Sequence, residues 1–159
     1  MPETQLTSAK PEARLKELGV TLPTPAKPLA SYIPWVRTGN LVYVSGQLPM
    51  RDGKVAFTGK VGKDLNVAKA QEAAVLCCHN SLAIVRDAIG SLDNVKRVVR
   101  AVGHVNCAAG FTDVHVVTNG ASDFLALVFG ENGRHTRLSL GAAELPLNAA
   151  FEFDLIVEV

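Results

Sequence analysis

An arginine and a glutamate near the carboxyl end of the chain are its clearest candidates for a chemical pair. Arg137 lies in a segment where polar and apolar residues alternate at the period of a β-strand, and Glu152 lies in a second such segment. If the chain folds back about Glu144-Leu145, Arg137 stands opposite Glu152 as a cross-strand pair. We therefore expect the two side chains to touch, on the face of a sheet that carries no helix.

This pair could have either of two roles. As an ion pair on the surface it would stabilise the fold by at most about 1 kcal/mol. If another subunit covers this polar face, the pair would instead line a pocket. There a guanidinium can grip a carboxylate through two parallel hydrogen bonds, and a carboxylate side chain can orient or activate a water molecule. The sequence pattern alone leaves both roles open.

The sequence lacks the spacings typical of metal, nucleotide and phosphate sites. Its four histidines, His79, His104, His115 and His135, fall on different expected elements and form no closely spaced pair. Neither a GxGxxG motif after a strand nor a GxxxxGK[ST] motif occurs. We therefore expect no metal and no cofactor.

The composition favours a single compact domain inside the cell. The chain has 159 residues, 48% of them hydrophobic, with 16 Lys and Arg against 15 Asp and Glu for a net charge of +1. A charge so near zero supplies no long-range attraction for phosphates, so we expect neither a nucleic acid nor a membrane as a partner. Three cysteines without disulfide spacing, no secretory signal and no membrane-spanning run favour a cytoplasmic location.

Periodicity and end signals indicate the elements that must position these side chains. In chain order we expect a short helix over 10–19, a strand over 40–48, a hairpin turn at 51–54, a helix over 66–90, a strand over 95–106, a helix over 119–130, and strands over 137–142 and 151–159. Phe124, Leu127 and Val128 are the expected buried stripe of the second of these two core helices, which we expect to be the shorter one. This order predicts an α+β domain, with an antiparallel or mixed sheet that has two helices on one face.

Two segments resemble one known family. The stretch GNLVYVSGQLP from Gly39 to Pro49, preceded by Tyr32, resembles the opening of the Rid (reactive intermediate deaminase, YjgF-like) family. The stretch from Arg137 to Val159 resembles that family's closing hairpin. The likeness covers residues 28–159, which we expect to form a single YjgF-like domain, and leaves 1–27 as an N-terminal arm with a short helix.

The resemblance implies a fold, an assembly and a reaction. The fold is a chorismate-mutase-like α+β fold, with a mixed, mostly antiparallel sheet and two helices on one face. The assembly is a homotrimer whose ligand pockets lie between neighbouring subunits. The reaction is hydrolysis of a small carboxylate-bearing enamine or imine, of the 2-aminoacrylate type, to a 2-keto acid and ammonia without a cofactor.

The resemblance also implies roles for individual residues. Arg137 matches the arginine that grips the carboxylate of the substrate, and Glu152 matches the glutamate that handles the attacking water. The substrate-binding positions of the family are matched by Tyr32, Ser45, Gly46, Asn119 and Ser139. Ser139 stands where many of the deaminases have cysteine, and Glu144 replaces a common arginine. With the added arm, these differences indicate a less-characterised branch of the family.

The sequence is compatible with three functions. The leading hypothesis is the imine hydrolase, a 2-iminobutanoate/2-iminopropanoate deaminase-like enzyme. The runner-up is a non-catalytic trimer that binds a small carboxylic acid and reports its concentration. An endoribonuclease, a function attached to parts of the family, ranks third because the sequence shows no basic stripe and no aromatic stacking platform.

Overall fold

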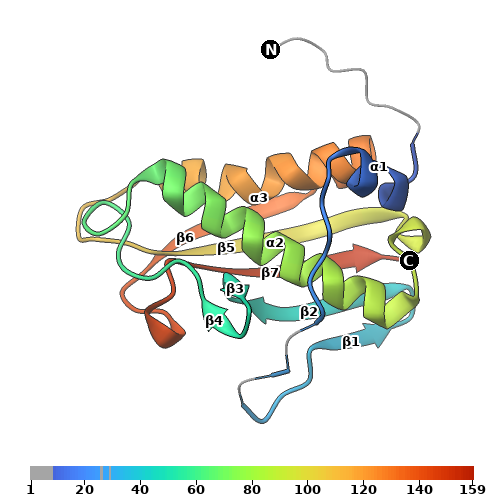
Figure 1. Cartoon of the computed structure of the whole chain (residues 1–159), viewed down its shortest axis with the longest axis horizontal. Coiled ribbons are helices and arrows are strands. Elements are labelled where there is room, and N and C mark those ends of the chain that lie inside the picture. The colour runs from blue at the N-terminus through green and yellow to red at the C-terminus, as the bar shows by residue number, and fades with distance from the viewer. Residues whose placement is uncertain (1–8, 26, 29) are drawn as a thin grey trace.

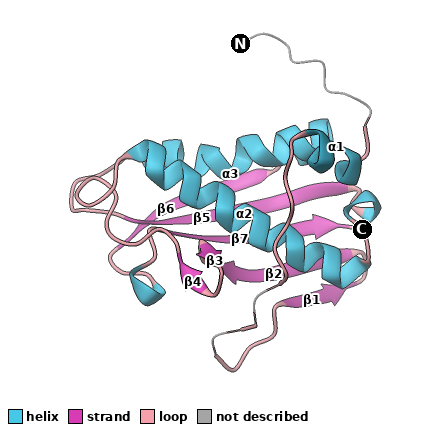
Figure 2. Ribbon diagram, in the orientation of Figure 1, coloured by secondary structure: helices cyan, strands magenta, loops and turns pink. Residues whose placement is uncertain are grey.

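Helices cover one side of a five-stranded sheet (Figures 1 and 2). The computed structural model describes residues 9–25, 27–28 and 30–159. The helices are α1 (Pro11–Glu17), α2 (Val67–Ile89) and α3 (Val114–Phe129). The strands of the main sheet are β1 (Trp35–Thr38), β2 (Leu41–Gln47), β5 (Arg97–Asn106), β6 (Thr136–Ala142) and β7 (Phe151–Glu158). A separate small hairpin consists of β3 (Met50–Arg51) and β4 (Lys54–Val55).

The strand order of the sheet is β1-β2-β7-β5-β6, so the last strand of the chain lies in the middle of the sheet. β5 and β6 run parallel because α3 connects them as a crossover helix, whereas all other neighbours in this sheet are antiparallel. This confirms the expected α+β fold with a mixed, mostly antiparallel sheet. The expected closing hairpin between 137–142 and 151–159 is wrong, because β5 separates β6 from β7.

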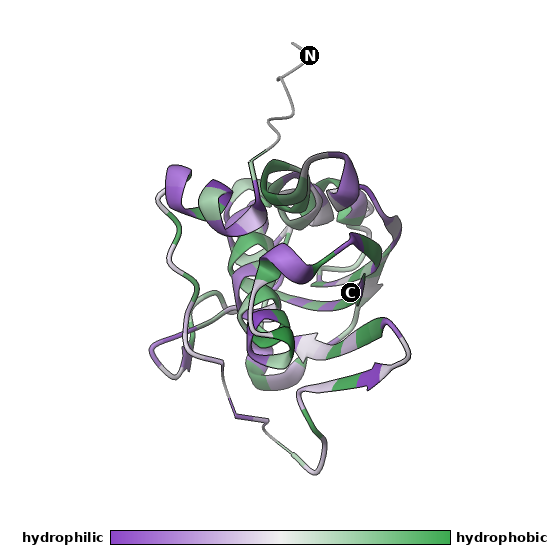
Figure 3. Cartoon of the chain, turned by 90° about the vertical axis from the view of Figure 1, so that its right-hand side faces the viewer, coloured by the Kyte–Doolittle hydropathy of each residue, from purple (hydrophilic) through white to green (hydrophobic). Residues whose placement is uncertain are grey.

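The core lies between the sheet and the two long helices (Figure 3). Phe151, Phe153, Leu155 and Val157 alternate along β7 and are fully buried, as their period of two predicts. α2 packs on β7 and β2, and α3 packs on β5 and β6. None of the helices in the described part of the chain is long and apolar enough to cross a membrane.

Helix α2 has the ends that the sequence predicts. The side chain of Asn66 caps its first turn by accepting a hydrogen bond from the Lys69 N–H at 2.9 Å. The helix ends before Gly90, whose φ of 84° suits glycine. These two end signals and the buried stripe between them act together, which explains the accurate prediction.

Helix α3 begins earlier than expected, and its buried face differs from the predicted one. It starts at Val114 rather than near Asn119, because a run of β-branched residues from Val114 to Thr118 hides its helical pattern. Phe124 and Val128 are buried as predicted, but Leu127 is 44% exposed and does not belong to the buried stripe.

Two glycines allow α3 to approach its neighbours closely. A Cβ on Gly103 of β5 would lie 2.6 Å from Thr118 Oγ1, and a Cβ on Gly120 would lie 2.6 Å from the Gln71 carbonyl oxygen of α2. Neither distance is possible for a larger residue without movement of the helix. The close contact holds α3 against both the sheet and α2.

Helix α1 packs against the same body of the protein. Leu15 of α1 is 2% exposed and Leu22, which follows the helix, is 7% exposed, and both belong to the main core. The Glu12 carboxylate accepts two hydrogen bonds from Arg86, at 3.0 and 2.6 Å, and one from the Leu92 N–H at 2.9 Å. The boundary between arm and domain at residues 27 and 28 stays a prediction, and residues 1–8 and 26 of the arm lie outside the described residues.

Candidate functional site

Arg137 and Glu152 do not touch, which corrects the pairing expected from the sequence. Arg137 stands opposite Ala101 of β5, and Ala101 stands opposite the buried Leu155 of β7. Arg137 therefore lies on the helix-covered face, at the edge strand. Glu152 stands opposite His104 and lies on the other face. The intervening strand alone separates the two backbones by about 10 Å.

Arg137 forms the first of two clusters, the arginine cluster, with Asn119, Ser122 and His135. Its Nη1 donates hydrogen bonds to Asn119 Oδ1 at 2.8 Å and to Ser122 Oγ at 3.2 Å. Its Nη2 donates to the His115 carbonyl oxygen at 3.3 Å. Asn119 and Ser122 lie on α3, so the helix and the edge strand together position the guanidinium.

The arginine cluster extends through Ser122 to His135. Ser122 Oγ lies 3.0 Å from His135 Nε2, and His135 Nδ1 lies 2.6 Å from the Gly133 carbonyl oxygen. Burial lowers the pKa of His135, the hydrogen bond to Gly133 opposes that change, and Arg137 adds to it. No sequence motif indicated Ser122 or His135 as site residues, although His135 precedes Arg137 by two positions and so shares its strand face.

Ser139 lies two positions after Arg137, on the same face of β6. Its hydroxyl is buried and has no hydrogen-bond partner among the residues that the structure describes. Its predicted role in substrate binding stays a prediction.

Glu152 and Gly46 form the second cluster, the glutamate cluster, to which we assign Ser45 as the chain neighbour of Gly46 and Tyr32 as a residue that lines a pocket with Gly46. Its carboxylate lies directly over Gly46, where a Cβ would come within 2.2 Å of Glu152 Oε1. Ser45 donates a hydrogen bond to the Ile33 carbonyl oxygen at 2.7 Å, which fixes the segment that carries Tyr32. A small pocket is lined by Tyr32 and Gly46, among others. The structure thus places Glu152 against Gly46, and places Tyr32 beside a pocket that Gly46 also lines.

The environment of Glu152 favours its protonated form. Burial raises the pKa of Glu152, nearby Asp154 raises it further, and His104 across the strand pair opposes the shift. Burial likewise raises the pKa of Asp154, against the opposing effects of His104 and Arg100. A carboxyl group whose pKa moves towards neutrality can both accept and return a proton.

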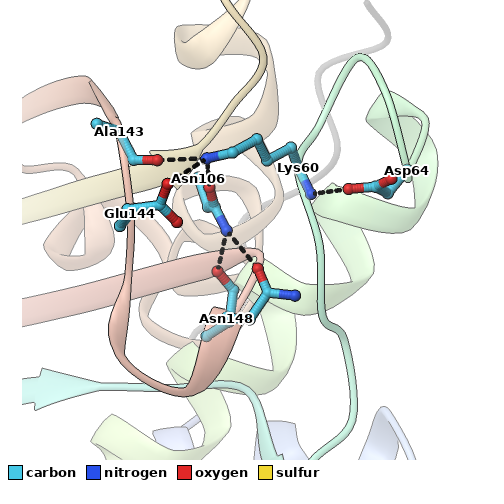
Figure 4. A network of polar contacts seen from close by, with 7 residues as sticks. Lys60, Asp64, Asn106, Ala143, Glu144 and Asn148 are labelled. Atoms are coloured by element: carbon cyan, nitrogen blue, oxygen red, sulfur yellow. Dashed lines mark hydrogen bonds and ion pairs between the residues drawn. The ribbon is translucent and has the colours of Figure 1, made fainter.

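A polar network beside the sheet holds the connection between β6 and β7 (Figure 4). Lys60 Nζ donates to Asn106 Oδ1 at 2.8 Å and to the Ala143 carbonyl oxygen, and lies 3.5 Å from the Glu144 carboxylate. The buried Asn106 amide in turn donates to the Ala149 carbonyl oxygen at 3.1 Å. The network fixes the start of β7 and hence the position of Glu152. No local sequence pattern predicts this network, because Lys60 and Ala143 are 83 residues apart.

No metal centre is evident in the part of the chain that the structure describes. Within it, no three of the His, Cys, Asp and Glu side chains come together in a group that could hold a metal ion. The chemistry on view is that of a cation on one face of the sheet and a protonatable carboxyl group on the other.

Similarity to known proteins covers nearly the whole chain. Residues 12–159 match a family model described as "YjgF/chorismate_mutase-like, putative endoribonuclease". The chain is 42% identical over 155 residues to Protein TCP17 of Trypanosoma cruzi, covering 97% of each. Among solved structures it is similar to Atu1372 of Agrobacterium tumefaciens, described as of unknown function, with 51% identity, a TM-score of 0.87 and coverage of 94% of this chain and 92% of that one. It is also similar to a Shewanella oneidensis protein described as a "putative endoribonuclease", with 33% identity, a TM-score of 0.92 and coverage of 95% and 100%.

Proposed function

This chain belongs to the YjgF/chorismate mutase-like family, and from that premise we propose that it hydrolyses small carboxylate-bearing imines to 2-keto acids and ammonia. The observation that carries the proposal is the division of the chemistry into two complementary clusters. The arginine cluster can bind a carboxylate, and the glutamate cluster can move a proton. Neither cluster alone has both a group that binds the carboxylate and a group that transfers the proton.

The proposal includes an assembly in which the two clusters meet between subunits. Within one protomer they lie on opposite faces of the sheet, with Arg137 on an edge strand. A cyclic assembly brings the edge of one protomer against a different surface of the next. The helix-free face also exposes large apolar side chains, each 41–48% accessible: Val36, Tyr43, Leu138 and Leu140. A homotrimer that covers this face would bury them and close three pockets.

The reaction needs two contributions from the protein, an anchor for the carboxylate and a group that transfers protons. Arg137 binds the carboxylate of the imine and holds the adjacent C=N bond near Glu152 of the neighbouring protomer. Glu152, as the carboxylate, takes a proton from water while the water oxygen attacks the carbon of the protonated imine, which gives a neutral carbinolamine. Glu152 returns that proton to the nitrogen, the nitrogen leaves as ammonia, and the hydroxyl proton passes to the Glu152 carboxylate or to solvent as the C–OH becomes the C=O of the keto acid. The upward shift in the pKa of Glu152 suits both proton transfers.

The test is hydrolysis of 2-aminoacrylate, which a dehydratase generates in situ and which tautomerises to the imine. We expect the wild-type protein to accelerate release of the keto acid. Glu152→Gln should lower kcat about 100-fold or more, because it removes the group that transfers the proton. Arg137→Ala should lower kcat/KM by about 100-fold, because the carboxylate is no longer anchored.

Asp154→Asn is the matched control, because Asp154 shares the face and the burial of Glu152 but lies two positions further along β7. It should keep most of the wild-type rate, because burial, and not the charge of Asp154, is the largest cause of the raised pKa of Glu152. No acceleration with several amino-acid-derived imines would overturn the hydrolase. Saturable binding of 2-oxobutanoate without turnover would then favour a binding protein, and Arg137-dependent cleavage of RNA would favour the activity named for the Shewanella relative.

A further inference from the structure

The hydrogen bonds of Arg137 leave one edge of its guanidinium available. Nη1 is engaged by Asn119 and Ser122, while Nη2 makes a single long contact of 3.3 Å with the His115 carbonyl. Among the residues that the structure describes, none accepts a hydrogen bond from Nε. A guanidinium presents its N–H groups in a planar fork, and a carboxylate binds across two adjacent nitrogens. The pair Nε and Nη2 is therefore the edge that a ligand can use.

The hydrogen bonds that link His135, Ser122 and Arg137 have a defined donor-to-acceptor direction. His135 Nδ1 lies 2.6 Å from a carbonyl oxygen, which only accepts, so Nδ1 carries a hydrogen. In the neutral ring Nε2 is then an acceptor, and the Ser122 hydroxyl donates to it. The Ser122 oxygen keeps its lone pairs for Arg137 Nη1. Burial lowers the pKa of His135, which favours this neutral ring.

Backbone packing fixes the Gly133 carbonyl, which lies at the end of this series of hydrogen bonds. A Cβ on Gly133 would lie 2.3 Å from the Leu125 carbonyl oxygen of α3, so the backbone at Gly133 lies directly on the helix. The carbonyl that holds His135 is thereby held against the same helix that carries Ser122. The series of hydrogen bonds from the Gly133 carbonyl through His135 and Ser122 to Arg137 is therefore anchored on α3 at the Gly133 end as well as at Ser122.

We propose that Ser122 and His135 are positioning residues, which hold Nη1 of Arg137 so that the ligand's carboxylate binds side-on across Nε and Nη2. The proposal rests on the proposed function of Arg137 as a carboxylate anchor. Neither Ser122 nor His135 needs to touch the ligand. Their effect is to keep the guanidinium from rotating and offering a different pair of nitrogens.

The first measurement needs no ligand. NMR of protein labelled with ¹⁵N-arginine reports the exchange of Nη1 and Nη2 of Arg137 by rotation, with Arg137→Lys used to assign the signals. Ser122→Ala and His135→Phe should accelerate this exchange. Ser122→Thr and His135→Gln, which retain a hydroxyl and an acceptor near Nε2, should leave it slow. Asp123→Asn, an exposed neighbour on the same helix, is the control for general effects on α3.

The second measurement is the affinity of the same variants for 2-oxobutanoate. Ser122→Ala and His135→Phe should each weaken binding about fivefold, the effect of one hydrogen bond, with partial rescue by Thr and Gln. Slow exchange in Ser122→Ala overturns the positioning role, whatever the affinities. Unchanged affinity despite faster exchange also overturns it. If exchange responds but Arg137→Ala binds the keto acid like wild type, the proposed function fails at Arg137, and the side-on grip with it.

Discussion

The contact between Gly46 and Glu152 links one residue's size directly to the chemistry. Gly46→Ala would place a methyl group 2.2 Å from the present position of Glu152 Oε1. Because that oxygen ends a flexible side chain, we expect it to swing away at little cost in stability. Hydrolysis of 2-aminoacrylate should then fall about 10-fold or more, since the proton-transferring group is misplaced.

Gly103→Ala is the instructive counterpart of that variant. Its methyl group would meet Thr118 and Phe151 in the core, and we expect a loss of about 1–3 kcal/mol in the free energy of unfolding. Urea denaturation and kinetics on both variants separate the two effects. A Gly46→Ala protein that is destabilised like Gly103→Ala, or that keeps full activity, would contradict this interpretation.

The raised pKa of Glu152 has a consequence for stability. Burial, the first cause of the shift, disfavours the charged carboxylate in the folded protein, so the folded state holds its proton where the unfolded chain has lost it. Below the usual value of 4.5, the carboxyl group is protonated in both states and does not reduce the stability of the folded protein. As the pH rises through the raised pKa, the buried group must ionise, and the stability falls. Glu152→Gln should raise the melting temperature near neutral pH and change it little below pH 4.5.

Asp154→Asn should show the same dependence on pH, because burial raises the pKa of that carboxyl too. The difference lies in function: Asp154→Asn retains hydrolysis and Glu152→Gln loses it. Thermal denaturation across the acidic and neutral range checks this. A stabilisation of Glu152→Gln that does not vary with pH would contradict the assigned cause.

At the scale of elements, α1 is bound to the body of the protein through Leu15. That side chain is 2% exposed, so Leu15→Ala should lower the free energy of unfolding by about 2–4 kcal/mol. Leu127→Ala, at a position 44% exposed on α3, should change it by less than about 1 kcal/mol. Chemical denaturation gives both values. Equal, small effects would show that α1 is dispensable for the stability of the domain.

Local patterns predicted some elements well and failed where the partners are distant. Asn66 and Gly90 bound α2 correctly because a cap and a C-terminal glycine are signals within the helix itself. The alternation at 137–142 predicted a strand correctly but assigned its faces the wrong way round. Leu138 is 41% exposed, while Arg137 faces the helices.

The dependence on distant partners also explains which contacts of the candidate site could be predicted from the sequence. Asn119 and Arg137 could be nominated from the family resemblance, and the structure brings them together. Their link to His135 and the separation of Arg137 from Glu152 follow from the position of β5 between β6 and β7, which no pattern within either segment records. A crossover through α3 moves β6 to the sheet edge, and only the complete topology shows it.

At the scale of the whole molecule, the helix-free face should be the assembly surface. Leu138→Glu places a charge on that face, and we expect it to convert a trimer to protomers in analytical ultracentrifugation. Leu127→Glu is the matched control, because Leu127 has nearly the same exposure, 44% against 41%, on the helix side. Wild-type protein that sediments as a single protomer, or equal behaviour of the two variants, would contradict the proposed assembly.

The placement of Arg137 and Glu152 on opposite faces of one sheet also makes a genetic prediction. If every pocket draws its cation from one chain and its carboxylate from the next, two defective proteins can complement each other. Co-expression of Arg137→Ala with Glu152→Gln should restore about a quarter of wild-type turnover, since random mixing leaves that share of interfaces with both intact halves. Pockets built within single chains would give no such recovery, and the mixture would stay as inactive as its parents.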